Sequence, residues 1–267
     1  MTKGVIIVTG STRGIGKEVA KQLLKLDYSV VINGRNTKRL HNTLSQLEAI
    51  SHHLLAVESD VSTPQGAKKL IDSAFQHFGR IDGLVNNVGV SSRGNVSALH
   101  PEVIQAVFQS NVFGAIYPTQ HALPFLRESK GAIIFVSSVA GIRGLPGLAP
   151  YCASKMALRA FVDSLRIEEH PTGVHFGIVM VGKTAVEADK EVITESGQKR
   201  LLEERKGKGV QAIPEVARGI VKALVRRKYK ITMTGIGKLQ AFLQTISPRL
   251  VERIIIKNVH RFEEGNK

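Results

Sequence analysis

Short apolar runs rich in β-branched residues alternate with helical patterns along most of the chain. Each run ends near a glycine, asparagine or serine, which is typical of a buried strand followed by a turn. Between the runs, apolar residues recur at helical spacing, as at Ile15, Val19, Leu23 and Leu26. The expected strands cover residues 5–10, 29–33, 54–59, 81–87, 132–138, 174–181 and 228–234.

Near-continuous apolar strands separated by helices predict a parallel sheet with both faces covered. The sequence therefore predicts an α/β fold, a doubly wound parallel sheet of about seven strands with helices on both faces. No repeat or linker interrupts the 267 residues, so we expect one domain over 1–267. Within it, residues 236–267 form a basic, amphipathic helical extension. Ligands of such sheets bind beyond the carboxyl ends of the strands.

A glycine-rich turn follows the first expected strand and precedes the first expected helix. It consists of Gly10, Ser11, Thr12, Arg13, Gly14, Ile15 and Gly16. Glycines at these positions permit a tight turn and let the backbone approach a pyrophosphate, to which the helix N-terminus presents free N–H groups. This context predicts a Rossmann-type dinucleotide site, whereas an isolated glycine pattern would indicate only a turn.

The end of the second expected strand indicates which dinucleotide binds. NAD enzymes commonly carry an acidic residue there, which holds the ribose 2′-hydroxyl. This chain has Asn33-Gly34-Arg35 instead, and Arg13 in the glycine turn adds a second cation. Either arginine alone could be a surface charge. Together, and without the acid, they favour a 2′-phosphate and predict NADP(H) as the cofactor.

Tyr151 and Lys155 have the i, i+4 spacing that places two side chains on one helix face. An ammonium group near a phenol favours the phenolate, so we expect Lys155 to lower the pKa of Tyr151. Such a tyrosine suits general acid–base work on a carbonyl oxygen. Ser138, at the end of the fifth expected strand, can hydrogen-bond the same oxygen. A Tyr-x-x-x-Lys pattern alone is common, so the prediction depends on its coincidence with the other motifs.

Taken in order and spacing, the segments TGSTRGIG, NNVG, SNVFG, VSSVAG and YCASK resemble the short-chain dehydrogenase/reductase family over about residues 3–230. This resemblance implies that Tyr151 is the catalytic acid/base and that Lys155 lowers its pKa and binds the nicotinamide ribose. It further implies that Ser138 orients the substrate oxygen and that Asn111 holds a water in a proton relay.

The resemblance also implies cofactor contacts by Asp60, Val61, Asn87 and Gly89, although Asp60 taken alone could equally be a helix cap. Thr184 is a further expected cofactor contact. The family usually has Pro-Gly after the sixth strand, where this chain has Val-Gly-Lys-Thr. Relatives pair through the helices that carry Asn111 and Tyr151, so a homodimer or homotetramer is expected.

Composition adds constraints on compartment and partners. The single cysteine, Cys152, excludes an intramolecular disulfide and fits a reducing compartment. We expect it to be buried and inert. No secretion signal or spanning segment is recognised, which predicts a cytoplasmic protein. The nine histidines lack metal-ligand spacing, so no metal site is expected, and the absence of tryptophan disfavours a nucleic-acid stacking surface.

The net charge of +15 is concentrated late in the chain, where residues 195–267 hold 17 Lys and Arg against 7 Asp and Glu. Leu239, Phe242, Leu243 and Ile246 form one apolar stripe, and Ser247-Pro248 predicts the start of a second helix with Leu250, Val251, Ile254 and Ile255. The stripes are flanked by Lys238, Arg249, Arg253, Lys257 and Arg261. Such helices could lie on a membrane surface, pack on the domain, cover the substrate pocket or contact a partner subunit.

The combined interpretation is an NADPH-dependent reductase of a small carbonyl compound, a ketone or aldehyde that is apolar or lipid-like. Two alternatives from other classes are a non-catalytic NADPH sensor and a lipid-surface scaffold. Among enzymes, a 3-oxoacyl reductase is the alternative. It is disfavoured because reductases acting on acyl carrier proteins end in a glycine-rich segment, whereas this chain continues into helices.

Overall fold

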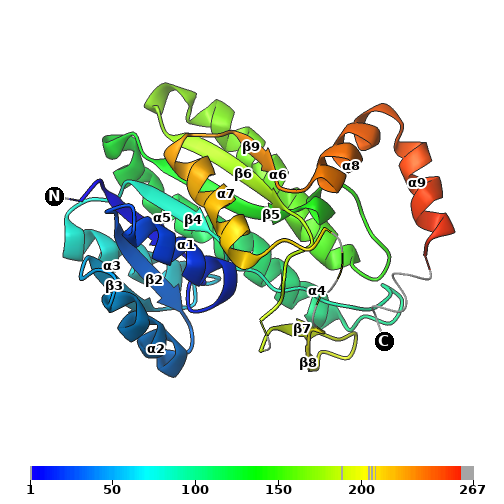
Figure 1. The fold of residues 1–267 in the computed structure, drawn as a ribbon, viewed down its shortest axis with the longest axis horizontal. Coiled ribbons are helices and arrows are strands. Elements are labelled where there is room, and N and C mark those ends of the chain that lie inside the picture. Colours follow the sequence, from blue (N-terminus) through cyan, green and yellow to red (C-terminus); the bar gives the residue numbers. More distant parts are fainter. Residues whose placement is uncertain (1, 188, 204, 206, 208, 260–267) are drawn as a thin grey trace.

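The computed structural model describes residues 2–187, 189–203, 205, 207 and 209–259, and its centre is one parallel sheet (Figure 1). The seven strands lie in the order β3-β2-β1-β4-β5-β6-β9, and every neighbouring pair is parallel. They are β1 Val5–Val8, β2 Ser29–Gly34, β3 Leu54–Glu58, β4 Gly83–Asn86, β5 Ala132–Ser138, β6 His175–Val181 and β9 Lys230–Thr232. The predicted doubly wound sheet is confirmed. β1 ends before Thr9 and Gly10, because these two residues already belong to the glycine turn.

Helices cover both faces of the sheet, and each face has its own apolar core. Helices α1 (Gly14–Leu24), α2 (Thr37–Glu48) and α7 (Ile213–Val225) pack on one face. Helices α3 (Pro64–Phe78), α5 (Gly114–Ser129) and α6 (Ala149–Glu168) pack on the other. In β1, Ile6 faces the first core and Ile7 the second. This two-sided burial explains why the strands have no polar face.

Helix α4 (Pro101–Phe108) continues through a π-helical turn, Gln109–Phe113, into α5. Turns of this kind insert one extra residue per turn and often occur at functional sites. Here the turn contains Asn111, whose side chain is fully buried. The irregularity therefore points an amide into the interior beside the end of β4.

The polar segment 183–209 contains a hairpin that the sequence did not predict. β7 (Glu191–Ile193) and β8 (Lys199–Leu201) pair antiparallel. The hairpin attaches to the loop after β4, because the Arg93 N–H donates to the Ile193 carbonyl at 2.8 Å and the Ile193 N–H donates to the Ser91 carbonyl at 3.0 Å. The two segments together form one wall beyond the carboxyl ends of the strands.

The chain continues into α8 (Gly235–Ile246) and α9 (Pro248–Lys257), which project from the body of the domain (Figure 1). Arg143 anchors them by donating to the Gln244 Oε1 and Pro248 carbonyl oxygens, both at 3.1 Å. Ser247 begins α9 as expected, but its hydroxyl makes no capping hydrogen bond. Arg261 lies outside the described residues. Across the described ranges, no helix is both long and apolar enough to cross a membrane.

Candidate active site

The glycine turn has the backbone geometry that a phosphate cradle requires. Gly10 and Gly14 have φ values of +59° and +54°, which disfavour residues with a side chain. A Cβ on Gly16 would lie 2.5 Å from both the Gly10 carbonyl oxygen and the Asn87 Nδ2. Because α1 begins at Gly14, its free N–H groups are directed at the cavity that these glycines line. The turn therefore fits a bound pyrophosphate.

Of the other residues of the glycine turn, some line the cavity and one supports the turn from behind. Thr12 and Ile15 line the cavity. Ser11 is fully buried, donates through its hydroxyl to the Val8 carbonyl at 2.6 Å and accepts from the Asn33 N–H at 2.9 Å. Ser11 is not one of the described residues that line the cavity. Its two hydrogen bonds instead join the glycine turn to β2.

Arginines gather at the carboxyl end of β2, as the sequence predicted. The two that act together are Arg13 and Arg39, however, and not Arg13 and Arg35. Arg13 and Arg39 both contact Oδ2 of Asp189, at 3.1 and 3.0 Å. One anionic oxygen is thus held between two guanidinium groups. The predicted Arg35 is more exposed and pairs with Asp60 at 3.2 Å. Arg39, four residues after Arg35, was missed, although its position in the first turn of α2 was a usable signal.

Asp60 and its neighbours line the cavity at the end of β3. Burial raises the pKa of Asp60, but hydrogen bonds from Ser62 and Arg35 outweigh it and leave the pKa below its ordinary value. Thr63, not Asp60, caps α3 by accepting from the Gly66 N–H. Val61 lines the same end of the cavity.

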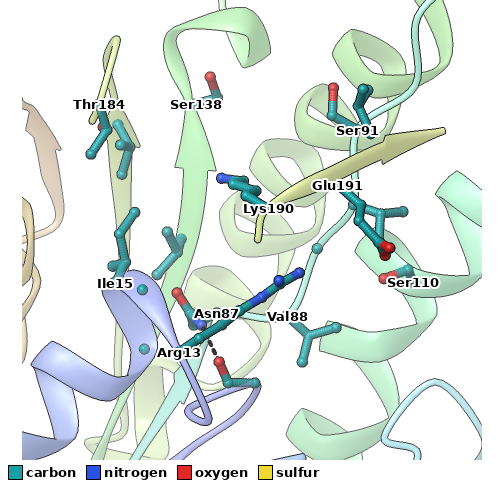
Figure 2. Close-up of a pocket in the computed structure, with 18 of the residues that line it drawn as sticks. Arg13, Ile15, Asn87, Val88, Ser91, Ser110, Ser138, Thr184, Lys190 and Glu191 are labelled. Atoms are coloured by element: carbon teal, nitrogen blue, oxygen red, sulfur yellow. Dashed lines mark hydrogen bonds between the residues drawn. The ribbon is translucent and has the colours of Figure 1, made fainter. Parts of the chain in front are cut away.

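Asn87 and Gly89 lie where β4 meets the glycine turn. The Asn87 amide donates to the Thr9 and Gly10 carbonyls at 3.0 and 3.1 Å, so its side chain holds the turn while the residue also lines the cavity (Figure 2). A Cβ on Gly89 would lie 3.1 Å from the Asn111 Oδ1 and 3.2 Å from the Lys155 Nζ. Gly89 therefore lets the backbone pass close to the Asn111 and Lys155 side chains.

Tyr151, Ser138 and Lys155 come together in the same cavity, which has a volume of about 990 Å³. The Ser138 hydroxyl lies close enough to the Tyr151 phenol to lower its pKa, and it accepts from the Ala140 N–H at 3.1 Å. The Lys155 ammonium lies 5.9 Å from the centre of the Tyr151 ring. The three residues predicted to carry the chemistry are thus adjacent.

The pKa of Tyr151 differs from the sequence expectation. Burial raises it above its ordinary value, and the Ser138 hydrogen bond and the charges of Arg205 and Arg93 only partly oppose this effect. The expected lowering by Lys155 does not dominate: Lys155 is itself buried, and it donates to the Val136 carbonyl at 3.0 Å. Burial, followed by the charge of Lys190, lowers the pKa of Lys155 to about 8.

Asn111 is bound on all sides. Its Oδ1 accepts from the Val90 N–H at 2.7 Å, and its Nδ2 donates to the Val90 carbonyl and to Ser154 Oγ, both at 2.9 Å. These bonds fix the loop after β4 against α6. Of the described cavity-lining residues, Ser110 rather than Asn111 comes from this turn, and Asn111 holds the Val90 backbone. Its predicted role in a water relay stays a prediction.

Thr184 lies in the departing segment after β6. It lines the cavity and donates through its hydroxyl to the Gly182 carbonyl at 3.1 Å. The segment is held in place by a bridge between Thr184 and Gln211. The altered Val-Gly-Lys-Thr sequence therefore still brings the predicted Thr184 to the cavity.

Cations line the part of the cavity near Tyr151, and the sequence analysis missed them. Arg93 belongs to the loop after β4, Lys190 precedes β7 and Arg205 follows β8. Figure 2 shows the Lys190 amine directed into the cavity. Arg93 follows a strand end and was identifiable in principle, whereas Lys190 and Arg205 belong to a segment whose position is set only by the tertiary structure.

Cys152 is buried, as predicted, and burial raises the pKa of its thiol. Within the described part of the chain, the structure contains no group of His, Cys, Asp or Glu side chains arranged to hold a metal ion.

Known proteins are similar to this chain in sequence. The family model of the short chain dehydrogenases matches residues 4–197. Dehydrogenase/reductase SDR family member 7B of Rattus norvegicus is 30% identical over 270 residues, covering 98% of this chain and 83% of that protein. 11-beta-hydroxysteroid dehydrogenase 1A of Arabidopsis thaliana is 30% identical over 257 residues, covering 93% and 73%.

Solved structures have the same fold. A short chain dehydrogenase/reductase from Burkholderia phymatum in complex with NAD superimposes with a TM-score of 0.81 at 21% identity, covering 93% of this chain and 95% of that one. An alcohol dehydrogenase from Thermococcus sibiricus complexed with 5-hydroxy-NADP gives 0.75 at 21% identity, covering 88% and 97%. With the motif match over most of its length, this chain belongs to the short-chain dehydrogenase/reductase family and is an oxidoreductase that acts on an alcohol or carbonyl group.

Proposed function

We propose that the enzyme uses NADPH to reduce a ketone or aldehyde with an apolar or lipid-like body. The observation that carries the cofactor choice is the pair of guanidinium groups, from Arg13 and Arg39, that hold a single carboxylate oxygen of Asp189. Two guanidinium groups on one anionic oxygen also suit a 2′-phosphate. The acid that would select a free 2′-hydroxyl is absent from Asn33-Gly34-Arg35.

The chemistry follows from the three adjacent side chains. When bound, NADPH supplies the hydride that adds to the carbonyl carbon. Ser138 holds the carbonyl oxygen, and Tyr151 donates its phenolic proton to that oxygen as negative charge develops. Lys155, held by the Val136 carbonyl, stabilises the phenolate that remains. The raised pKa of Tyr151 keeps the phenol protonated at neutral pH, which is the form that reduction needs.

The cofactor choice is tested by fluorescence titration with NADPH and NADH. Arg39→Ala and Arg13→Ala should each weaken NADPH by about tenfold, or 1.4 kcal/mol, and leave NADH nearly unchanged. Arg35→Ala should have a smaller effect, since Arg35 is more exposed and paired with Asp60. Arg218→Ala, an exposed arginine on α7, is the matched control. Equal binding of NADH, with no effect of the first two variants, would overturn the NADPH proposal.

The two alternatives are a non-catalytic NADPH sensor and a 3-oxoacyl reductase. Each predicts a different result in a turnover assay. NADPH binding without turnover of any carbonyl in a broad panel would favour the sensor. Turnover of 3-oxoacyl thioesters far above simple ketones would favour the acyl reductase. The adjacency of Tyr151, Ser138 and Lys155 supports an active enzyme over the sensor.

We also propose that α8 and α9 rest on an anionic membrane surface, so that the cytoplasmic enzyme is peripherally bound. The apolar stripe of α8 is turned outward, with Ile236, Leu239, Phe242 and Ile246 between 57% and 73% exposed. In α9, Leu250 and Ile254 are 45% and 47% exposed, whereas Val251 is buried. Basic residues flank this stripe, and the last quarter of the chain carries much of the net charge of +15. Exposed apolar side chains beside cations match a lipid interface with anionic headgroups.

Sedimentation with phosphatidylcholine vesicles, with and without phosphatidylserine, tests this attachment. The full chain should bind the anionic vesicles, and Phe242→Ser combined with Ile246→Ser should abolish binding. Val96→Ser, which removes an exposed valine elsewhere, is the control. If the double variant changes the oligomeric state instead and vesicle binding is absent, the stripe is an interface between subunits and the membrane proposal fails.

We further propose a homodimer or homotetramer that forms through α5 and α6. Phe113, stacked on Tyr117, and Met156 are each more than a third exposed next to these helices. Light scattering should give a dimer or larger species for the wild-type chain, and Met156→Lys should shift it towards the monomer. A wild-type monomer at micromolar concentration would contradict this assembly.

A further inference from the structure

Arg93, Lys190 and Arg205 line the cavity on the side of Tyr151, and we call these three residues the cationic wall. Arg93 is enclosed by the loop after β4 and donates to the Ser91 hydroxyl at 3.0 Å and to the Ser92 carbonyl at 3.2 Å. Both acceptors are neutral. The guanidinium of Arg93 is therefore partly removed from water without a compensating negative charge.

Most carboxylates near the cationic wall form ion pairs with residues outside it. Glu191 pairs with Lys199 at 3.5 Å, and Asp189 pairs with Arg13 and Arg39. Glu187 lies beside the glycine turn, and its charge opposes the lowering of the Lys190 pKa less than burial, Arg205 and Arg13 cause it. Within residues 2–187, 189–203, 205, 207 and 209–259, no carboxylate forms an ion pair with Arg93 or Arg205.

The three cations also repel one another. Burial and then the charge of Arg205 lower the pKa of Arg93, and burial lowers the pKa of Arg205. Enclosure by the cavity and then Arg205 lower the pKa of Lys190. Like charges enclosed together without a counter-charge are unfavourable, and such arrangements gather at functional sites. An anion in the cavity would remove both the repulsion and the unpaired charge.

The rest of this region is apolar, with Val90, Leu145, Leu148, Val192 and Leu202 among the lining residues. We propose that the carbonyl substrate carries a negatively charged group, a phosphate or a carboxylate, which the cationic wall binds while the carbonyl oxygen faces Tyr151 and Ser138. This inference rests on the proposed reductase function and adds an anionic group to the apolar body expected there. The substrate is therefore an anionic amphiphile rather than a purely apolar ketone.

The test uses methyl ketones that differ only in charge. A series of methyl-ketone carboxylates of different chain length is compared with their neutral methyl esters, and methyl-ketone phosphate monoesters with their free alcohols. At the favoured length, kcat/KM with NADPH should be at least about tenfold higher for the anion. Added salt should reduce this advantage, because the attraction is screened. The better of the two anion series identifies the group as carboxylate or phosphate.

Variants locate the anion. In Arg93→Met and in Arg205→Met, the ratio of anionic to neutral kcat/KM should fall towards one, and Arg93→Lys should retain part of it. Because the ratio is the readout, a general loss of activity does not imitate the effect. Arg218→Met is the control that should keep the ratio.

Two results would overturn the inference. One is equal kcat/KM for anionic and neutral ketones at every chain length. The other is a tenfold weaker NADPH affinity in Arg93→Met and Arg205→Met with an unchanged ratio, which would assign the cations to the cofactor. Calorimetric titration of the enzyme with the anionic ketone measures binding independently of turnover. It therefore tests the anion site separately from the proposed reductase function. Binding that depends on Arg93, without NADPH oxidation, would keep the anion site and reject the reaction.

Discussion

Replacing Lys155 by methionine should stabilise the protein in the absence of cofactor at neutral pH. The Lys155 side chain is 4% exposed and has one hydrogen-bond acceptor, the Val136 carbonyl. Burial and the charge of Lys190 lower its pKa from 10.5 to about 8. The charged lysine is therefore less stable in the folded protein than in the unfolded chain.

The size of the effect follows from these two pKa values. Below pH 8 both states are protonated, so the full penalty of about 3 kcal/mol applies. Between pH 8 and 10.5 the folded protein loses the proton first and the penalty declines to about 1 kcal/mol near pH 10. The Lys155→Met variant lacks the hydrogen bond from residue 155 to the Val136 carbonyl, which contributes about 1 kcal/mol. The net gain for Lys155→Met is about 2 kcal/mol at pH 7 and about zero near pH 10.

Urea unfolding of wild type and Lys155→Met at both pH values measures this difference. Lys25→Met, which replaces an exposed lysine after α1, is the control and should change the free energy of unfolding by less than about 0.5 kcal/mol. A stability difference between Lys155→Met and wild type that is the same at pH 7 and pH 10 would refute the reasoning. The burial of the charge would then be compensated by a contact not identified above.

Three further predictions concern the cofactor turn and its surroundings. Asp189→Ala should tighten NADPH by roughly threefold to tenfold in fluorescence titration, because its carboxylate no longer occupies the two arginines, and should leave NADH unchanged. Gly16→Ala should lower both NADPH affinity and the melting temperature, since its Cβ would lie 2.5 Å from the Asn87 amide; unchanged binding would contradict the close packing of the turn. Asn111→Ala should reduce the free energy of unfolding by about 2 kcal/mol or more, because the Val90 backbone groups lose their partner. A loss of kcat without a loss of stability would instead indicate the water relay.

Most of the fold could be predicted because its signals are local. Each strand of the sheet is an apolar run buried on both faces, and the glycine turn requires conformations that only glycine adopts readily. The adjacency of Ser138, Tyr151 and Lys155 also followed from strand ends and helical spacing. These features depend on residues within one or two elements.

What the sequence did not show depends on contacts between distant segments. The β7–β8 hairpin forms against the loop after β4, so its polar sequence gave no sign of a defined wall. The pKa of Tyr151 is raised because its surroundings exclude water, which the spacing of Tyr151 and Lys155 cannot indicate. Arg39 and Asp189 meet only because α2 and the segment before β7 converge on the glycine turn.

In the proposed reaction, this enzyme reduces a carbonyl group with NADPH and Tyr151 donates the proton. The most direct measurement is the rate of NADPH oxidation with a panel of neutral and anionic ketones, for wild type and for Tyr151→Phe. Loss of one positioned general acid should lower kcat by about a hundredfold or more, with NADPH affinity nearly retained. Equal rates for the two proteins, or faster oxidation of alcohols with NADP⁺ than reduction of any ketone, would contradict the account.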